Sequence, residues 1–195
     1  MSKMSNREKI ITEGLRVVHE YGYAGASVRD ISRAAGVPLG SFTNHFSSKE
    51  AFGLEILERY YRASQAFVEI ALGDKTKSVR ERLDLYFDYV LNDLLGPEFR
   101  SGCLLGNLCA EVPNQSDALR LRLAEVVEER RSAISSLLQA GQEAGELPAD
   151  LDIGQASGFI YFSLQGAILM SKLLRSADPV NNCRQQVISY ILRMT

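Results

Sequence analysis

The side chains best suited to reading nucleic acid lie close together between residues 27 and 49. Asn44 carries the paired donor and acceptor that match the edge of adenine, and the guanidinium of Arg29 matches guanine or a phosphate. Thr43 offers a methyl group and a hydroxyl, and Lys49 is a natural partner for phosphate. This mixture predicts contact with double-stranded DNA, provided that one helix carries these side chains into a groove.

Two short helices are expected to position these groups. The first would begin at Ser27, which together with Asp30 has the spacing of a capping box. It would end at a turn formed by Gly36-Val37-Pro38. The second begins near residues 39–41, and Phe42 and Phe46 lie four apart, as on one buried face of a helix. A tight turn between two such helices is typical of a helix-turn-helix.

The residues after the second short helix predict a third element. Ser47-Ser48-Lys49-Glu50 has the pattern of a second capping box, which would open a long helix through Phe52, Ile56 and Leu57. Arg33 lies four residues after Arg29, so both could meet phosphate or guanine from one helix face. A plain pair of packed helices with a solvated polar face has the same spacing, and the spacing alone leaves that alternative open.

The whole chain of 195 residues follows the helical period, so we expect an all-α fold. Longer helices are predicted over residues 6–22, 79–95, 117–144, 152–175 and 183–193, with Tyr21 on the apolar face of the first. The pattern predicts two domains. Residues 1–50 would form a small N-terminal three-helix head with the helix-turn-helix, and residues 51–195 a larger helical body.

Charge, cysteine content and hydropathy limit the class of protein. Residues 1–50 carry seven Lys and Arg against five acids, whereas the whole chain has a net charge of −2, so the N-terminal part suits a polyanion. Three cysteines do not form a disulfide framework, and the polar N-terminus lacks the apolar core of a secretory signal. The most apolar stretch, Gly158–Met170, is too short to cross a bilayer and predicts a buried helix. We expect a cytoplasmic protein without contact to membranes.

The stretch from Ile11 to Phe52 resembles the DNA-binding head of the TetR family of transcriptional regulators. The resemblance covers about a quarter of the chain in detail. The residues that carry it are Gly22, Ser27-Val28-Arg29-Asp30-Ile31, Ala34-Ala35-Gly36-Val37, Gly40-Ser41-Phe42, His45-Phe46 and Ser48-Lys49-Glu50.

The resemblance implies roles for single residues of the head. Positions that match Ser27, His45 and Lys49 contact phosphates in the family, and positions that match Arg29, Gly40, Ser41, Thr43 and Asn44 face the groove. The family usually has a tyrosine where this chain has Thr43, so an aromatic contact to DNA is absent here.

The body is similar to the family's ligand-sensing and dimerisation domain. Arg100–Val112 resembles more narrowly a branch that includes electrophile-sensing NemR-like and acrylate-responsive AcuR-like repressors, which have a cysteine where Cys103 stands. The resemblance implies a homodimer paired through the last two helices, residues 152–193, because two reader helices must lie about 34 Å apart to meet a palindromic operator.

A ligand site in the body is predicted from helical spacing. Cys103 and Asn107 lie four apart, as do Tyr161 and Gln165, and Phe87 falls on the apolar face of its helix. A small-molecule site is typically an apolar cavity into which a few polar groups converge. These five residues are therefore the expected ligand-binding set. The alternative is a solid core in which the polar tips meet backbone groups.

Cys103 follows Gly102, and we expect it in the first turn of a helix near Arg100, where both features favour the thiolate. It is then a candidate sensor of electrophiles; a structural thiol is the alternative. Cys109 would lie on another face of the same helix, and Cys183 would be packed in the last one.

The sequence offers no motif for a metal ion, a cofactor or catalysis: His19 and His45 lie far apart, and no nucleophile and base are paired. We therefore expect no enzyme, but a DNA-binding transcriptional repressor that a small molecule or electrophile releases from its operator. A helical enzyme of unknown chemistry and a protein–protein module are the competing hypotheses.

Overall fold

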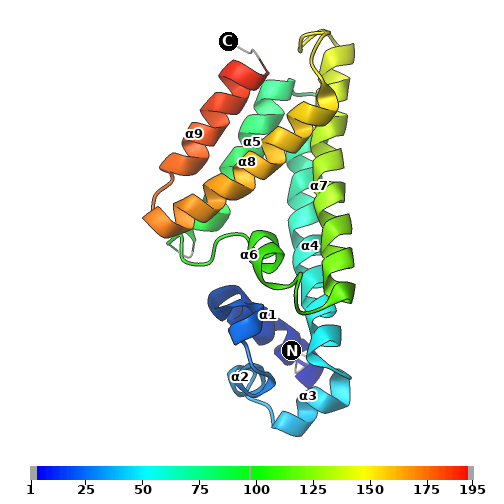
Figure 1. The fold of residues 1–195 in the computed structure, drawn as a ribbon, viewed down its shortest axis with the longest axis vertical. Helices are drawn as coiled ribbons and strands as arrows, with labels where there is room; N and C mark the ends of the chain where they lie inside the picture. The colour runs from blue at the N-terminus through cyan, green and yellow to red at the C-terminus, as the bar shows by residue number, and fades with distance from the viewer. Residues whose placement is uncertain (1–3, 97, 193–195) are drawn as a thin grey trace. The chain divides into compact units, whose positions relative to one another are not determined.

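The computed structural model describes residues 4–96 and 98–192, in which every regular element is a helix (Figure 1). This confirms the all-α fold class. The elements are α1 (Asn6–Gly25), α2 (Val28–Ala34), α3 (Leu39–His45), α4 (Lys49–Gly73), α5 (Val79–Leu95), α6 (Leu104–Glu111), α7 (Asp117–Glu143), α8 (Ile153–Leu174), α9 (Asp178–Gln186) and the π-helical turn η1 (Val187–Ile191).

The chain divides into two compact units. The first comprises Met1–Arg62 and Leu104–Glu125, and the second comprises Ala63–Cys103 and Val126–Thr195. Helices α4 and α7 contribute to both units, and α6 belongs to the first. These units describe packing, so the predicted division of function at residue 50 stays a prediction.

The core of the first unit is built around three phenylalanines. The rings of Phe42, Phe46 and Phe52 have centroids 5.2–5.3 Å apart, in tilted and edge-on arrangements. Gly14 of α1 fits against them because a Cβ atom there would lie 2.4 Å from Cζ of Phe52. The predicted stripe of Phe42 and Phe46 is confirmed, and it fixes α3 against α1 and α4.

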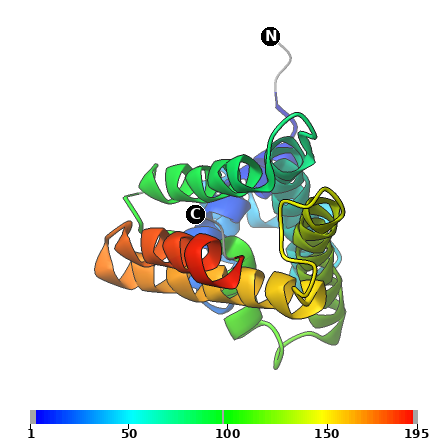
Figure 2. The same ribbon diagram turned by 90° about the horizontal axis from the view of Figure 1, so that it is seen from above.

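The second unit buries a larger apolar core, to which α4, α5, α7, α8 and α9 contribute. Figure 2 shows α8 and α9 side by side, next to α5 and α7. Gly141 of α7 allows close packing on α5, since a Cβ atom there would lie 2.3 Å from Cγ2 of Val79. Phe87, Leu83 and Leu164 are fully buried in this core.

The end of α1 departs from the prediction. The helix continues to Gly25 rather than stopping at residue 22, and it is kinked at Gly22, whose φ is +81°. Glycine tolerates this left-handed conformation without a steric penalty. Tyr21 was expected on the apolar face, but its side chain, one residue before the kink, is 64% exposed, so the predicted apolar face ends at Val18.

The beginning of α4 and the last helix also differ from expectation. Ser48 alone caps α4, with its Oγ accepting from the amide of Ala51 at 3.0 Å, so the predicted capping box with Glu50 is wrong. The carboxylate of Glu50 instead accepts a hydrogen bond from Ser116. The last helix begins at Asp178, as the Asp178-Pro179 pair predicts, which is before the periodic stretch 183–193, and it becomes a π-helical turn after Gln186.

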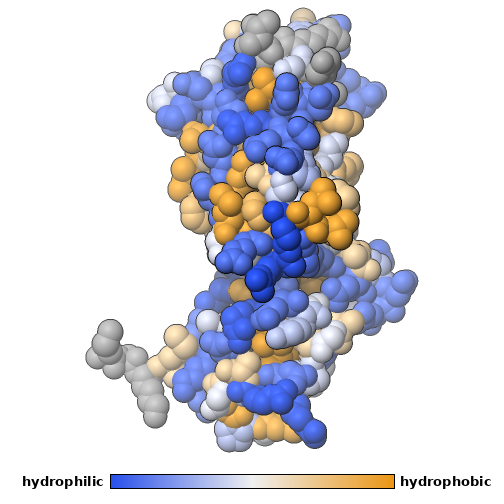
Figure 3. All heavy atoms as spheres, turned by 90° about the vertical axis from the view of Figure 1, so that its left-hand side faces the viewer, coloured by the Kyte–Doolittle hydropathy of each residue, from blue (hydrophilic) through white to orange (hydrophobic). Residues whose placement is uncertain are grey.

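Helix α8 is the one described helix that is long and apolar enough to cross a membrane, and 39% of its most apolar window is buried. The expectation of a simply buried helix is wrong for its outer face. That face exposes large apolar side chains: Phe159, Phe162, Leu169, Met170, Leu173 and Leu174. Figure 3 shows hydrophobic side chains gathered on the side of the molecule that carries α8 and α9.

Candidate nucleic-acid interface

The turn between α2 and α3 is closed by backbone hydrogen bonds. The amide of Gly36 donates to the carbonyl of Arg33 and the amide of Val37 to that of Ser32, both at 3.1 Å. Gly36 has a φ of +62°, which a residue with a side chain rarely adopts. This turn, followed by Pro38, orients α3 relative to α2 as a helix-turn-helix requires.

Helix α3 buries one side and exposes the other. Phe42 is 1% exposed, whereas Thr43, Asn44 and His45 are exposed and Ser41 is half-buried. The hydroxyl of Thr43 donates to the carbonyl of Gly40 at 3.1 Å, so it is already engaged with backbone. The face that points to solvent therefore carries the amide of Asn44 and the imidazole of His45 as its main polar groups.

Gly40 lies on this exposed face, and the fold itself does not require a glycine there. Its φ is not in the left-handed range, and a Cβ atom there would meet nothing within 4 Å. Glycine in a helix costs about 0.5–1 kcal/mol relative to alanine. A missing side chain at this point instead permits the close approach of an external surface.

Helix α2 carries two arginines, of which one is paired with a carboxylate. Ser27 caps the helix, with its Oγ accepting from the amide of Asp30 at 3.1 Å, which confirms the predicted start. The Ser27 hydroxyl, and next the nearby Arg33, keep the pKa of the Asp30 carboxyl below its usual value. Arg33 is thus paired with Asp30, whereas Arg29 is exposed and forms no ion pair among the described residues.

Lys49 is held in place by the fold. Its Nζ lies 4.6 Å from the centre of the Tyr23 ring, and the hydroxyl of Tyr23 donates to the Lys49 carbonyl at 3.1 Å. Burial lowers the pKa of the Lys49 ammonium, and the carboxylate of Glu111 opposes that shift. Lys49 is therefore a half-buried, oriented cation rather than a mobile surface lysine.

Glu111, from the end of α6, is a residue that sequence reasoning missed. Its Oε2 accepts a hydrogen bond from the amide of Ala24 at 2.9 Å, and its carboxylate lies against Gly22 at the kink of α1. A Cβ atom at position 22 would lie 2.6 Å from Oε1, so only glycine leaves room for the carboxylate. The residues are 87 positions apart, and no local pattern signals the contact.

Four of the predicted ligand-binding residues, Phe87, Cys103, Tyr161 and Gln165, lie in the second unit. Phe87 and Tyr161 are buried in its core, and the half-buried Cys103 packs against that core. The Oε1 atom of Gln165 is buried without a hydrogen-bond partner among the described residues. Asn107 lies on α6, in the first unit.

The surroundings of the three cysteines differ from expectation in part. Cys103 immediately precedes α6 rather than lying in its first turn, and Arg100 is paired with Glu98 at 3.3 Å. Cys109 is exposed, and burial raises the pKa of the Cys183 thiol, which favours its unreactive form. Among the described residues, no group of His, Cys, Asp and Glu could hold a metal ion.

The fold and this surface define a helix-turn-helix protein with an all-helical body. Two family models match the chain: bacterial regulatory proteins of the tetR family over residues 10–56, and the tetracyclin repressor-like C-terminal domain over residues 79–187. The chain therefore belongs to the TetR family, as its sequence predicted.

Named relatives match over almost the whole chain. The HTH-type transcriptional repressor DhaR of Mycobacterium sp. strain GP1 is 34% identical over 195 residues, which are 100% of this chain and 96% of DhaR. The transcriptional regulator AcuR of Cereibacter sphaeroides is 33% identical over 90% of this chain and 80% of AcuR. The repressor NemR of Escherichia coli K12 is 30% identical over 95% of this chain and 93% of NemR.

Solved structures agree with these relatives. A regulatory protein TetR from Rhodobacter sphaeroides superposes with a TM-score of 0.88 at 31% identity, covering 93% of this chain and 96% of that one. The reduced form of Escherichia coli NemR gives 0.82 at 30% identity, covering 93% and 94%. The chain is a transcriptional repressor of the helix-turn-helix type, in a family in which ligands typically release the DNA.

Proposed function

We propose that this repressor binds a palindromic DNA operator as a homodimer and leaves it when a small molecule or an electrophile reaches the second unit. The observation that carries the proposal is the exposed face of α3, which combines Asn44 and His45 with a glycine that the fold does not need. Such a face fits the major groove, where an α-helix can reach the base edges.

The proposed roles within the interface come from the family resemblance, and burial and pairing support them. Arg29 and Asn44 are exposed and read bases, with Gly40, Ser41 and Thr43 beside them on the groove side. Ser27, His45 and Lys49 contact phosphates, and Lys49 is already oriented by the Tyr23 ring. Arg33 is left out of the base-reading set because its guanidinium is paired with Asp30.

The homodimer is formed by α8 and α9. Phe162, Leu173 and Leu174 belong to a group of large apolar side chains exposed on α8, and such groups commonly mark protein–protein interfaces. A two-fold axis through this surface would bury it and bring two α3 helices to one face of the operator. A cytoplasmic location fits this function.

The inducer acts at the core of the second unit. Phe87 and Tyr161 supply apolar walls, and the unpartnered Oε1 of Gln165 supplies an acceptor for a donor on the ligand. Cys103 packs against the same core and would bond covalently to an electrophile. Asn107, the fifth residue of the predicted set, belongs to the first unit and is not part of this proposed site.

The test is release of DNA measured by fluorescence anisotropy, with a labelled duplex taken from the region upstream of the coding sequence. The full-length protein should bind this duplex more tightly than a shuffled duplex of the same composition, and a quinone should release it. Equal affinity for both duplexes at physiological salt would contradict the proposal.

A further inference from the structure

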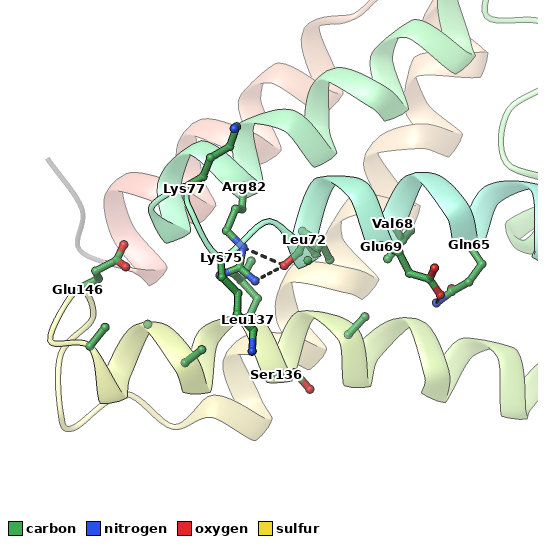
Figure 4. A pocket seen from close by; sticks show the side chains of 15 residues that line it. Gln65, Val68, Glu69, Leu72, Lys75, Lys77, Arg82, Ser136, Leu137 and Glu146 are labelled. Carbon is green, nitrogen blue, oxygen red and sulfur yellow. Dashed lines mark hydrogen bonds between the residues drawn. The ribbon is translucent and has the colours of Figure 1, made fainter.

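A pocket of about 570 Å³ lies in the second unit, apart from the proposed inducer site. It is bounded by the end of α4, the turn after it, the beginning of α5 and the last turns of α7 (Figure 4). Phe87, Cys103, Tyr161 and Gln165 do not line it. Its volume falls within the range of small-molecule sites.

The pocket wall contains a buried guanidinium that has no carboxylate partner among the described residues. Arg82 is 8% exposed, and its Nε and Nη2 atoms both donate to the carbonyl oxygen of Leu72, with Nε at 2.8 Å. It forms no ion pair within residues 4–96 and 98–192. The C-terminal end of α4 offsets part of its charge, but a buried cation normally has an anion beside it.

A second cation belongs to the same wall. Lys75 is exposed in the turn after α4, lines the pocket and has no ion-pair partner in the described part of the chain. Lys77, by contrast, donates to Asp74 at 2.8 Å, and Figure 4 shows it pointing away from α7. The positive charge available to a ligand is therefore that of Arg82 and Lys75.

The acidic residues of the pocket limit the charge of the ligand. Glu69 accepts from Gln65 at 3.1 Å, and Glu146 accepts from the amide of Val79 at 2.7 Å. In Figure 4 they lie at opposite ends, with Arg82 between them. They would repel a dianion, whereas a single negative charge placed at Arg82 keeps its distance from both.

Apart from the polar Gln65 and Ser136, the rest of the lining is apolar and mostly small. Val68, Leu72 and Leu137 form its larger side chains, and alanines and a glycine of α7 leave the space open: Ala133, Ala140, Gly141 and Ala144. A ligand that matches both the cationic and the apolar part of the lining carries one anionic group and an apolar tail. We propose that this pocket binds a small organic monocarboxylate, with its carboxylate at Arg82 and Lys75 and its tail against α7.

The experiment is isothermal titration calorimetry of the full-length protein with sodium hexanoate as the probe. The decisive variants are Lys75→Glu, which inverts the exposed charge, and Ala140→Trp, which fills the pocket from an exposed helix position. Arg80→Glu is the matched control, because it makes the same charge change at a nearby residue that does not line the pocket. Circular dichroism confirms that each variant is folded.

We expect saturable binding of hexanoate that weakens about tenfold or more in Lys75→Glu and Ala140→Trp and stays unchanged in Arg80→Glu, as the loss of a charge-assisted contact implies. Hexan-1-ol and inorganic phosphate should bind far more weakly. No saturable binding of hexanoate overturns the proposal, as does equal binding of hexan-1-ol or phosphate. Binding that survives both pocket variants and is lost in Gln165→Leu also overturns it, since the probe then occupies the inducer site.

Discussion

The amide of Ala24 donates to Oε2 of Glu111 at 2.9 Å, which joins the last turn of α1 to the end of α6. The same carboxylate lies against Gly22 at the kink and within electrostatic reach of Lys49. One side chain of α6 thus contacts the segment that leads into the helix-turn-helix and influences Lys49, which we propose contacts DNA. A movement of α6 would reach the reader helices through this contact.

Glu111→Gln should weaken this junction while it keeps the shape of the side chain. Loss of a charged acceptor should lower the free energy of unfolding by about 1 kcal/mol, since hydrogen bonds to charged groups contribute about 1.5–3 kcal/mol and this one is partly solvated. Affinity for DNA should rise, because the neutral amide no longer repels phosphates or competes with them for the ammonium of Lys49. Urea denaturation and anisotropy measure the two effects, with the exposed Glu69→Gln as control. Unchanged stability and affinity would exclude Glu111 as a link.

Gly40→Ala separates the needs of the fold from those of DNA binding. Alanine meets no neighbour at this position and is the better helix former, so thermal unfolding should show a gain of about 0.5–1 kcal/mol. Binding to the operator should weaken, since the added methyl group would meet the DNA. A variant that is more stable and binds DNA as tightly as the parent would remove Gly40 from the interface.

The dimer is tested by a charge placed on the outer face of α8. Leu173 is 71% exposed, and Leu173→Glu would put a carboxylate into the proposed subunit interface. Light scattering should find a dimer for the parent chain and a monomer for the variant at micromolar concentration. Ile70→Glu is the matched control on α4, where Ile70 is 70% exposed, and it should remain a dimer.

The route of induction is tested by separating a covalent from a non-covalent response. Cys103→Ser should keep its affinity for DNA and lose release by maleimides and quinones, if the thiol is the sensor. Gln165→Leu should instead impair release by ligands that do not react with thiols. Release that persists in Cys103→Ser but disappears in Cys109→Ser or Cys183→Ser would place the sensor elsewhere. Normal release in all three variants would leave a non-covalent ligand as the explanation of induction.

Local features were the ones predictable from sequence. The Ser27 cap, the Gly36 turn and the phenylalanine stripe of α3 depend on neighbours within a few residues, and all appear as expected. The bounds of α5 were predicted to the residue, and a capping box at Ser78 accounts for its beginning.

Features that depend on distant partners could not be predicted in this way. Glu50 pairs with Ser116 instead of completing a local cap, and Glu111 reaches Ala24 across 87 positions. Periodicity identified α8 as apolar but could not show that one face would stay exposed, because that depends on which other helices cover it. The predicted set of DNA contacts remains a prediction for experiment.

The central claim is that α2 and α3 read DNA sequence, and binding of matched duplexes across a salt series tests it most directly. Arg29→Ala and Asn44→Ala should lose about 1–3 kcal/mol on the operator and little on random DNA, since each removes a base contact. His45→Ala and Lys49→Ala should weaken binding to both duplexes, and Lys49→Ala, which removes a cation, should lower the salt slope by about one. Arg33→Ala, which removes a guanidinium paired with Asp30, should change neither the affinity for the two duplexes nor the salt slope. Equal losses on operator and random DNA in Arg29→Ala and Asn44→Ala would contradict the account.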